Sequence, residues 1–193
     1  MKDPILTLCL FGVVQTLSYT SAAQGTPDTL SIPRDASTRL VAYAEVVPVE
    51  NATQAELYAR GKVWFAQNFK SAKDVIQADD KQAGILVGKG WQEVRVAGAM
   101  GTAVPQKLNY TIRLALKDGR YRYELTDFSF GFLPSATDLN PATNPAEKVA
   151  FVRNKKGITP FSMGYRKALD SAVKQTTDGL KVAMTKPAAG GDW

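Results

Sequence analysis

Side chains that commonly catalyse reactions near neutral pH are scarce in this sequence. It contains no histidine, and its single cysteine is Cys9, close to the N-terminus. Imidazole and thiolate groups perform much of the nucleophilic, proton-transfer and transition-metal chemistry of proteins. Zinc sites of the usual cysteine and histidine type cannot be built without them. We therefore expect a protein that is not an enzyme and that carries no cofactor and no metal.

Carboxylates remain as candidate chemical groups. Asp79 and Asp80 could bind a cation or act as paired acids, but adjacent acidic residues in a hairpin are typical turn formers. No third carboxylate follows them at the spacing of a calcium loop. Asp138, Asn140 and Asn144 could offer oxygen ligands, although a polar loop is the plainer interpretation. A glycosidase that uses carboxylates alone stays open, but the sequence singles out no pair for it.

Two further patterns are weak as chemical motifs. The glycines at 84, 88 and 90 lack the spacing of a dinucleotide-binding loop, and they are better placed to let a strand bend or a helix approach. Ser162 and Lys167 could imitate a serine–lysine pair, but a serine at this point is expected to cap a helix.

The first 23 residues have the organisation of a secretory signal peptide. Lys2 precedes an apolar run, Ile5–Val14, and small residues follow at Ser21–Ala23, so Gln24 is the expected first mature residue. The run is shorter than the ~20 residues that span a bilayer. A lipoprotein leader fits less well, because no small residue stands just before Cys9, and a buried N-terminal helix is the other alternative. We expect export to the periplasm or beyond the cell, with no transmembrane segment in the mature chain.

The rest of the chain divides into a flexible lead-in over 24–37, one domain over 38–185 and a loose tail over 186–193. The formal net charge is +6 and is spread along the chain, which is typical of a solvated surface. With no disulfide available after cleavage of the leader, the domain must be held by packing.

Hydrophobic patterns predict the elements of this domain. Leu40–Val47 is rich in β-formers and ends at Pro48, and a helix should run from Gln54 to about Phe69 after a cap at Asn51 or Thr53. Strands are expected over Asp74–Ala78 and Ala83–Val94, with Ala78 opposite Ala83 and Ile76 opposite Ile85. A glycine-rich connection, Arg95–Pro105, follows.

One face of the predicted helix over 54–69 is apolar. Its members share an arc of roughly 140° at 100° per residue. They are Leu57, Tyr58, Gly61, Trp64, Phe65 and Phe69. Glycine destabilises a helix interior by about 1 kcal/mol, so Gly61 in this arc indicates a close approach of backbone to backbone.

A hairpin around Asp118-Gly119 has the best-determined register. A two-residue Asp-Gly loop prefers a type I′ turn and fixes the pairing of both strands. The expected pairs are Lys117–Arg120, Leu116–Tyr121, Ala115–Arg122, Leu114–Tyr123, Arg113–Glu124 and Ile112–Leu125. Alternate pairs are apolar, so the register sorts side chains into a core face and an open face.

The alternation breaks at Asp127, beyond which Phe128 and Phe130 take the open-face parity. Either a bulge returns these rings to the core, or they lie exposed on the sheet. A long loop should then occupy 131–160, with Val149–Val152 as a short strand or a plug over the core edge. A final helix is expected from Ser162 or Tyr165 to Met184.

The predicted order is β-α-β-β-β-β-α. This order favours an α+β domain with a single curved antiparallel sheet, both helices on one face and the other face open.

Three segments carry a resemblance to a known family. They are Leu57-Tyr58-Ala59-Arg60 with Trp64-Phe65, Gly84–Gly90 (GILVGKG) and Lys117–Tyr123 (KDGRYRY). Over roughly Thr38–Thr126 the chain resembles an uncharacterised family of exported bacterial domains, a domain of unknown function with a TATA-binding-protein-like fold. The resemblance implies the same architecture as the predicted order of elements, and it implies no chemistry.

From these patterns we expect a non-enzymatic binding or protein-interaction module. Its contact surface would be the open sheet face around Arg113, Arg122 and Glu124, with Phe128 and Phe130 at its edge, or the cleft where the loops over 95–105 and 131–160 approach the sheet. The alternative is a small-molecule or lipid carrier with a pocket between the C-terminal helix and the sheet. The partner would be an envelope protein, a glycan or a small ligand. Nucleic acid is not expected, because the face is mixed in charge and fold alone does not imply function.

Overall fold

The computed structural model describes residues 30–69, 75–98, 101–139 and 141–186. The expected leader over 1–23, the first part of the lead-in and nearly all of the tail lie outside the described residues. In the described ranges, no helix is both long enough and apolar enough to cross a bilayer.

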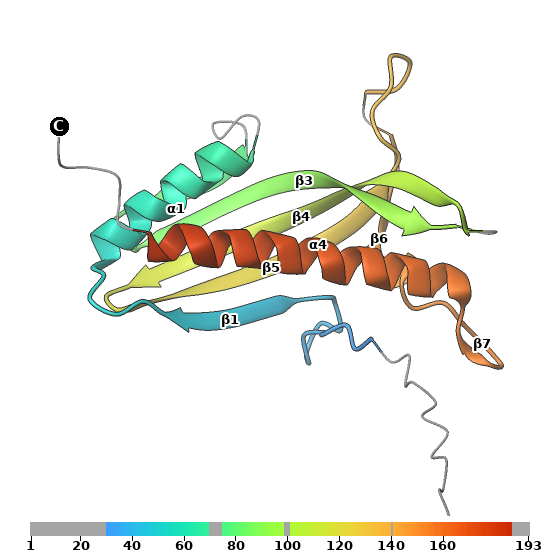
Figure 1. The fold of residues 1–193 in the computed structure, drawn as a ribbon, viewed down its shortest axis with the longest axis horizontal. Helices are drawn as coiled ribbons and strands as arrows, with labels where there is room; N and C mark the ends of the chain where they lie inside the picture. The colour runs from blue at the N-terminus through green and yellow to red at the C-terminus, as the bar shows by residue number, and fades with distance from the viewer. Residues whose placement is uncertain (1–29, 70–74, 99–100, 140, 187–193) are drawn as a thin grey trace, which may run out of the picture.

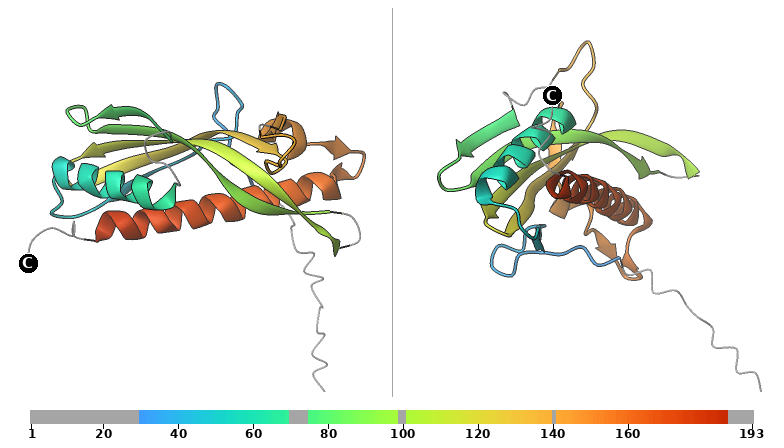
Figure 2. Two further views of the ribbon diagram at one scale, coloured as in Figure 1. Left: turned by 90° about the horizontal axis from the view of Figure 1, so that it is seen from above. Right: turned by 60° about the vertical axis from the view of Figure 1, so that its left-hand side comes forward.

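One antiparallel sheet forms the body of the protein (Figure 1). Its strands are β1 (Tyr43–Pro48), β2 (Ile76–Asp80), β3 (Ile85–Ala97), β4 (Ala103–Lys117), β5 (Arg120–Gly131) and the short β6 (Thr143–Pro145). The spatial order is β1-β5-β4-β3-β2, with β6 paired to β5. Helices α1 (Gln54–Asn68) and α4 (Pro160–Thr185) lie on the same face of the sheet (Figures 1 and 2). The predicted α+β architecture is confirmed.

Helix α1 begins where its sequence provides a complete N-terminal cap. Thr53 is the cap, and its side chain and that of Glu56 bond reciprocally to each other's backbone N–H groups. The predicted apolar arc is the buried face of the helix, with Leu57 and Phe65 fully buried. Of the two candidate caps, Thr53 is therefore confirmed.

Glycines in β3 leave the space that the aromatic rings at the C-terminal end of α1 occupy. A Cβ atom built on Gly88 would overlap the Phe65 ring, and one on Gly90 would overlap the Phe69 ring. The prediction that these glycines let a helix approach is confirmed. Gly61 differs from expectation: a Cβ there would lie 3.1 Å from Leu86 Cδ1, so α1 meets side chains of the sheet at this point and not its backbone.

Helix α4 is longer than predicted and is capped earlier. Thr159 is the cap and accepts from the Ser162 N–H, and Pro160 occupies the first turn, where its missing donor does no harm. The prediction of Ser162 as the cap is wrong, because its buried hydroxyl donates to the Val149 carbonyl at 2.7 Å. The side of α4 that faces the sheet is buried, with Leu169 and Leu180 fully covered.

The region expected to be one long loop holds short elements. After β6 come helix α3 (Ala146–Val149) and a two-stranded pair, β7 (Arg153–Asn154) with β8 (Gly157–Ile158). No strand forms over 149–152; Ala146 and Ala150 are fully buried and the segment covers an edge of the core, as the second alternative proposed.

Two predictions about the strands are wrong. Ala78 pairs with Val87 and Asp80 with Ile85, because the turn occupies 81–84, with Gly84 at a φ of 66° and the Asp80 carboxylate accepting from the Ala83 N–H. The connection expected over 95–105 is mostly strand, since β3 reaches Ala97 and β4 starts at Ala103.

The hairpin around Asp118 has every predicted pair, from Lys117–Arg120 to Ile112–Leu125. Its turn is not type I′, because φ is positive at Gly119 (73°) but not at Asp118, the sign pattern of a type II turn. The turn is held by its surroundings: the Asp118 carboxylate accepts from the Gln54 N–H at 2.7 Å, and the Gly119 N–H donates to the Ala52 carbonyl at 2.8 Å.

The lead-in is structured from residue 30 onward, which corrects the prediction of a flexible segment up to 37. Ile32 is buried, and Arg34 forms a bridge with Val41. Asp35 closes the turn between them: hydrogen bonds, first from the Ser37 hydroxyl and then from Thr38, lower the pKa of its carboxyl to about 2.

Glu45 joins three elements of the fold. Its Oε2 accepts from the Tyr123 hydroxyl at 2.6 Å and from Lys181 Nζ at 2.8 Å, so β1, β5 and α4 meet at one carboxylate. The hydrogen bond from Lys181, followed by that from Tyr123, lowers the pKa of Glu45 below its ordinary value of 4.5.

The packing of the Phe69 ring against Gly90 can be tested by a double substitution. Gly90→Ala should destabilise the protein by about 1–3 kcal/mol, because the methyl group overlaps the Phe69 ring in a packed interface. Adding Phe69→Leu should return part of that loss, so that the two changes are not additive in chemical denaturation. If the losses in the free energy of unfolding of the two single variants simply add in the double variant, the contact between Gly90 and the Phe69 ring is contradicted.

The Glu45 carboxylate should make stability depend on pH. Because its pKa is lowered on folding, its contribution is present above 4.5 and is lost as pH falls through the folded value. Glu45→Gln should therefore lower the melting temperature at pH 7, with the difference shrinking as pH falls below the unfolded value. The exposed neighbour Glu50 supplies the control, Glu50→Gln, and a Glu45→Gln difference that does not change with pH would refute the assignment.

Candidate functional site

The sheet has one face that neither α1 nor α4 covers, here called the open face (Figure 2). Side chains alternate across the sheet, so even-numbered residues of β3 and β4 enter the core and odd-numbered residues reach the open face. The central part of the open face is formed by Ala44, Val46, Val87, Lys89, Trp91, Asn109, Thr111, Arg113, Ala115, Arg122, Glu124 and Ser129.

The structure brings together the charged residues predicted for this face. Arg113 lies directly opposite Glu124 on the neighbouring strand, and Arg122 lies two residues before Glu124. Glu124 nevertheless forms its ion pair with Arg122: Arg122 Nη2 lies 3.9 Å from Glu124 Oε2. The two side chains are 54% and 33% exposed. Such an exposed pair contributes little to stability, so these charges are free to meet a partner.

Phe128 and Phe130 do not belong to the open face. The register between β4 and β5 shifts between Asn109 and Thr111, where Asp127 adopts a φ of 55°. This bulge returns both rings to the core, where they are 2% and 1% exposed. The bulge interpretation is confirmed, and the expectation of two phenylalanines at the edge of the contact surface is wrong.

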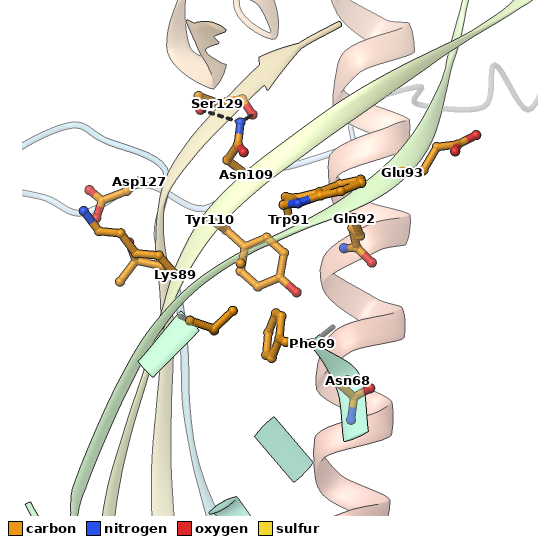
Figure 3. Close-up of a pocket in the computed structure, with 13 residues that line it drawn as sticks. Asn68, Phe69, Lys89, Trp91, Gln92, Glu93, Asn109, Tyr110, Asp127 and Ser129 are labelled. Atoms are coloured by element: carbon orange, nitrogen blue, oxygen red, sulfur yellow. Dashed lines mark hydrogen bonds between the residues drawn. The ribbon is translucent and has the colours of Figure 1, made fainter. Parts of the chain in front are cut away.

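A hollow of about 780 Å³ opens beside Trp91 (Figure 3). Trp91 is 41% exposed, and Lys107 Nζ lies 5.2 Å from its ring centroid. Asn109 faces Ser129 across the strands, and its side-chain amide donates to the Ser129 hydroxyl at 3.3 Å. Lys89 and Asp127 line the same hollow. Sequence reasoning did not include these residues, although extending the hairpin register from β4 to β3 would have placed Trp91 and Asn109 on this face.

The inner wall of the hollow is aromatic. Phe69 and Tyr110 line it from the helix side, with ring centroids 6.3 Å apart. Burial raises the pKa of Tyr110 above its ordinary value of 10, which is already well above neutral pH. Gln92 closes this side by donating to the Ala172 carbonyl and the Thr176 hydroxyl, both at 3.3 Å. The hollow can bind by stacking and hydrogen bonding, and it presents no ionised tyrosine.

The acidic candidates are used within the fold. Asp79 accepts from the Tyr58 hydroxyl and pairs with Lys62, both on α1, and Asp80 closes the turn after β2. Asp138 lies in a turn with Ser135, Asn144 lies in β6, and Asn140 lies outside the described residues. No group of three or more acidic residues able to hold a metal ion occurs in the described part of the chain.

The remaining predicted sites are not assembled as expected. Ser162 is buried against α3 and makes its hydrogen bonds there. The cleft predicted where the loops over 95–105 and 131–160 approach the sheet stays a prediction, although 95–97 and 103–105 are strand. Arg122 and Glu124 line a hollow of about 470 Å³ beside the segment over 33–36.

Known proteins with the same architecture resemble this chain. Residues 43–131 match the family model described as "Domain of unknown function (DUF4468) with TBP-like fold". The match runs from the start of β1 to the end of β5, so it includes the open face and excludes α4. The resemblance inferred from the sequence is confirmed. No curated protein matches the chain.

Two solved bacterial structures share the fold. A DUF4468 family protein from Bacteroides ovatus is 17% identical, with a TM-score of 0.64, over 83% of this chain and 94% of that one. A TBP-like protein from Parabacteroides distasonis is also 17% identical, with a TM-score of 0.64, over 81% of this chain and 98% of that one. At this identity the likeness concerns the fold alone.

Substitutions at Asp127 test whether the bulge in β5 depends on the left-handed backbone at this residue. Asp127→Gly should be neutral or slightly stabilising, because glycine adopts a positive φ without strain. Asp127→Val should destabilise by about 1–2 kcal/mol, because a β-branched residue resists this conformation. Equal melting temperatures for the two variants would show that the bulge does not need the left-handed backbone.

Proposed function

On a scaffold whose residues 43–131 match the DUF4468 family model with its TBP-like fold, we propose that the protein is a non-enzymatic binding module that contacts a partner through the open face. The main support is the character of that face. Val46 is 57% exposed and lies opposite the exposed Arg122, while Trp91, on the same face, is 41% exposed, and Arg113 is exposed as well. Exposed apolar surface among arginines and aromatic rings is typical of protein contact sites.

The partner we propose is a component of the cell envelope, a protein or a glycan. This proposal rests on the signal-peptide pattern of the first 23 residues, from which we expect export. Nucleic acid fits the face poorly despite the name of the fold. A minor-groove binder of this kind inserts apolar wedges, and Phe128 and Phe130, the candidates for that role, are buried.

The alternative, a carrier with a pocket between α4 and the sheet, has less support. Leu169, Val173 and Leu180 fill that space and are at most 5% exposed. What is described between α4 and β3 is a cleft of about 360 Å³, and the larger hollow opens at the end of α1. Native mass spectrometry of protein purified from its host tests this alternative, because a carrier should retain its ligand.

Site-specific photocrosslinking in the host cell tests the proposed surface. A benzoylphenylalanine at Val46, on the open face, should form a discrete adduct. The same residue at Val182, on the outer side of α4, should not, although the two valines are 57% and 55% exposed. Adducts of equal yield at both positions, or an adduct at Val182 alone, would contradict the proposal.

Charge reversal then tests which residues hold the partner. Arg113→Glu with Arg122→Glu should reduce the Val46 adduct by about tenfold or more, because both charges face the partner. Arg153→Glu with Lys155→Glu, the matched control in the exposed turn between β7 and β8, should leave it unchanged. Equal loss in both double variants would indicate a dependence on net charge and not on the open face.

A further inference from the structure

We propose that the groove between the free edge of β3 and the flank of α4 binds an extended peptide segment of a partner protein, which adds a strand to the sheet. This surface is the rim of the sheet. It shares Lys89 and Trp91 with the open face, but its test measures the backbone amides of β3, so it stands or falls separately from the function proposed above. Three observations support it: an unpaired strand edge, a helix that walls it, and an ordered sequence of charges along it.

The edge exists because β3 is longer than its outer neighbour. Strand β2 pairs with β3 from Ile85 as far as Gly88, whereas β3 continues to Ala97 and stays paired with β4 on its other side over that whole length. From Lys89 onward, β3 is therefore the outermost described strand on this side of the sheet. A strand edge of this kind is a template for pairing with another chain.

The hydrogen-bonding direction of each residue follows from the register. The Leu116 N–H donates to the Gly84 carbonyl at 2.8 Å, so Gly84 and Leu116 form a hydrogen-bonded pair. Such pairs recur every second residue in an antiparallel ladder, so even-numbered residues of β3 bond to β4 and odd-numbered residues point their N–H and C=O groups outward. In the described part of the chain, no hydrogen bond satisfies the outward groups of Trp91, Glu93 and Arg95.

Helix α4 forms the second wall of the groove. It crosses β3 closely: a Cβ on Gly164 would lie 2.7 Å from the Ala97 carbonyl oxygen, and Gln92 bonds to the Ala172 carbonyl. Between the two elements runs the cleft of about 360 Å³, lined on the helix by small or polar side chains. These are Gly164, Lys167, Ala168, Ser171, Ala172 and Gln175. The cleft and the hollow beside Trp91 meet at Glu93, so both open onto the same edge of β3.

A peptide inserted between a strand edge and a helix can interact with both elements at once. Its backbone bonds to the outward groups of β3, and alternate side chains lie on α4 or beside the open-face residues. The charged side chains at Lys89, Glu93 and Arg95 discourage indiscriminate edge pairing and select a partner with the complementary order.

The complementary order can be written down. An antiparallel segment should place an acid opposite Arg95, a base opposite Glu93, an apolar residue opposite Trp91 and an acid opposite Lys89. With threonine at the alternate positions, the probe is acetyl-Glu-Thr-Lys-Thr-Val-Thr-Glu-amide. Its matched control exchanges the first two charges and keeps the net charge of −1: acetyl-Lys-Thr-Glu-Thr-Val-Thr-Glu-amide.

Amide hydrogen exchange of the protein, followed by NMR, is the direct test. Saturation with the probe should slow exchange at Trp91, Glu93 and Arg95, whose N–H groups point outward. Exchange at Gln92 and Val94, which already bond to β4, should change little. The charge-exchanged peptide should bind about tenfold more weakly or worse, and Glu93→Lys should narrow that preference.

Methylation of the peptide backbone provides a control that leaves the protein intact. A methyl group on the valine nitrogen blocks a hydrogen bond to β3 and should abolish protection of the odd-numbered amides. A methyl group on the nitrogen of the next threonine, which faces away from β3, should have a much smaller effect. Equal effects of the two methyl groups, equal binding of the two charge orders, or no protection by the probe would each overturn the proposal. Slow exchange of these amides in the free protein would also overturn it, because the edge would then be occupied by the chain itself or by a second copy.

Discussion

The alternation of side chains along the β3–β4–β5 meander is the constraint on which the rest of this structure depends. A shift of one residue would turn every buried leucine and tyrosine of these strands to the solvent. The register is held at one end by the Asp118-Gly119 turn, which also bonds to the backbone at Ala52 and Gln54 and so anchors the link between β1 and α1. At the other end, the bulge at Asp127 keeps Phe128 and Phe130 in the core. The open face and the outward edge of β3 both follow from this one pattern.

Elements governed by local patterns could be predicted from the sequence, and those governed by distant contacts could not. The capping residue and apolar stripe of α1 and the pairing around Asp118 are written in neighbouring residues. The turn after β2 was misplaced because Gly84, and not Asp79-Asp80, supplies its left-handed residue. The type of the Asp118 turn was also missed, since it is set by contacts with residues near 52 that no local rule contains.

The candidate site shows the same division. The positions of Arg113, Arg122 and Glu124 follow from a hairpin register that a two-residue loop specifies. Trp91 and Asn109 required knowledge of which strand pairs with β4 and how far, and the glycine-rich composition near residue 98 suggested a loop where β3 in fact continues. The free edge of β3 could not be foreseen at all, because it depends on β2 being short.

Taken together, the described residues offer two surfaces to a partner: an open face of mixed charge, and a groove at the rim of the sheet. Side-chain oxidation footprinting tests the central claim most directly, with the intact protein compared in the presence and absence of the host envelope fraction. The account predicts that oxidation of Val46 and Trp91 falls while that of Phe161 and Val182, of similar exposure on α4, is unchanged. Protection of Phe161 and Val182 with Val46 and Trp91 still fully oxidised would contradict it.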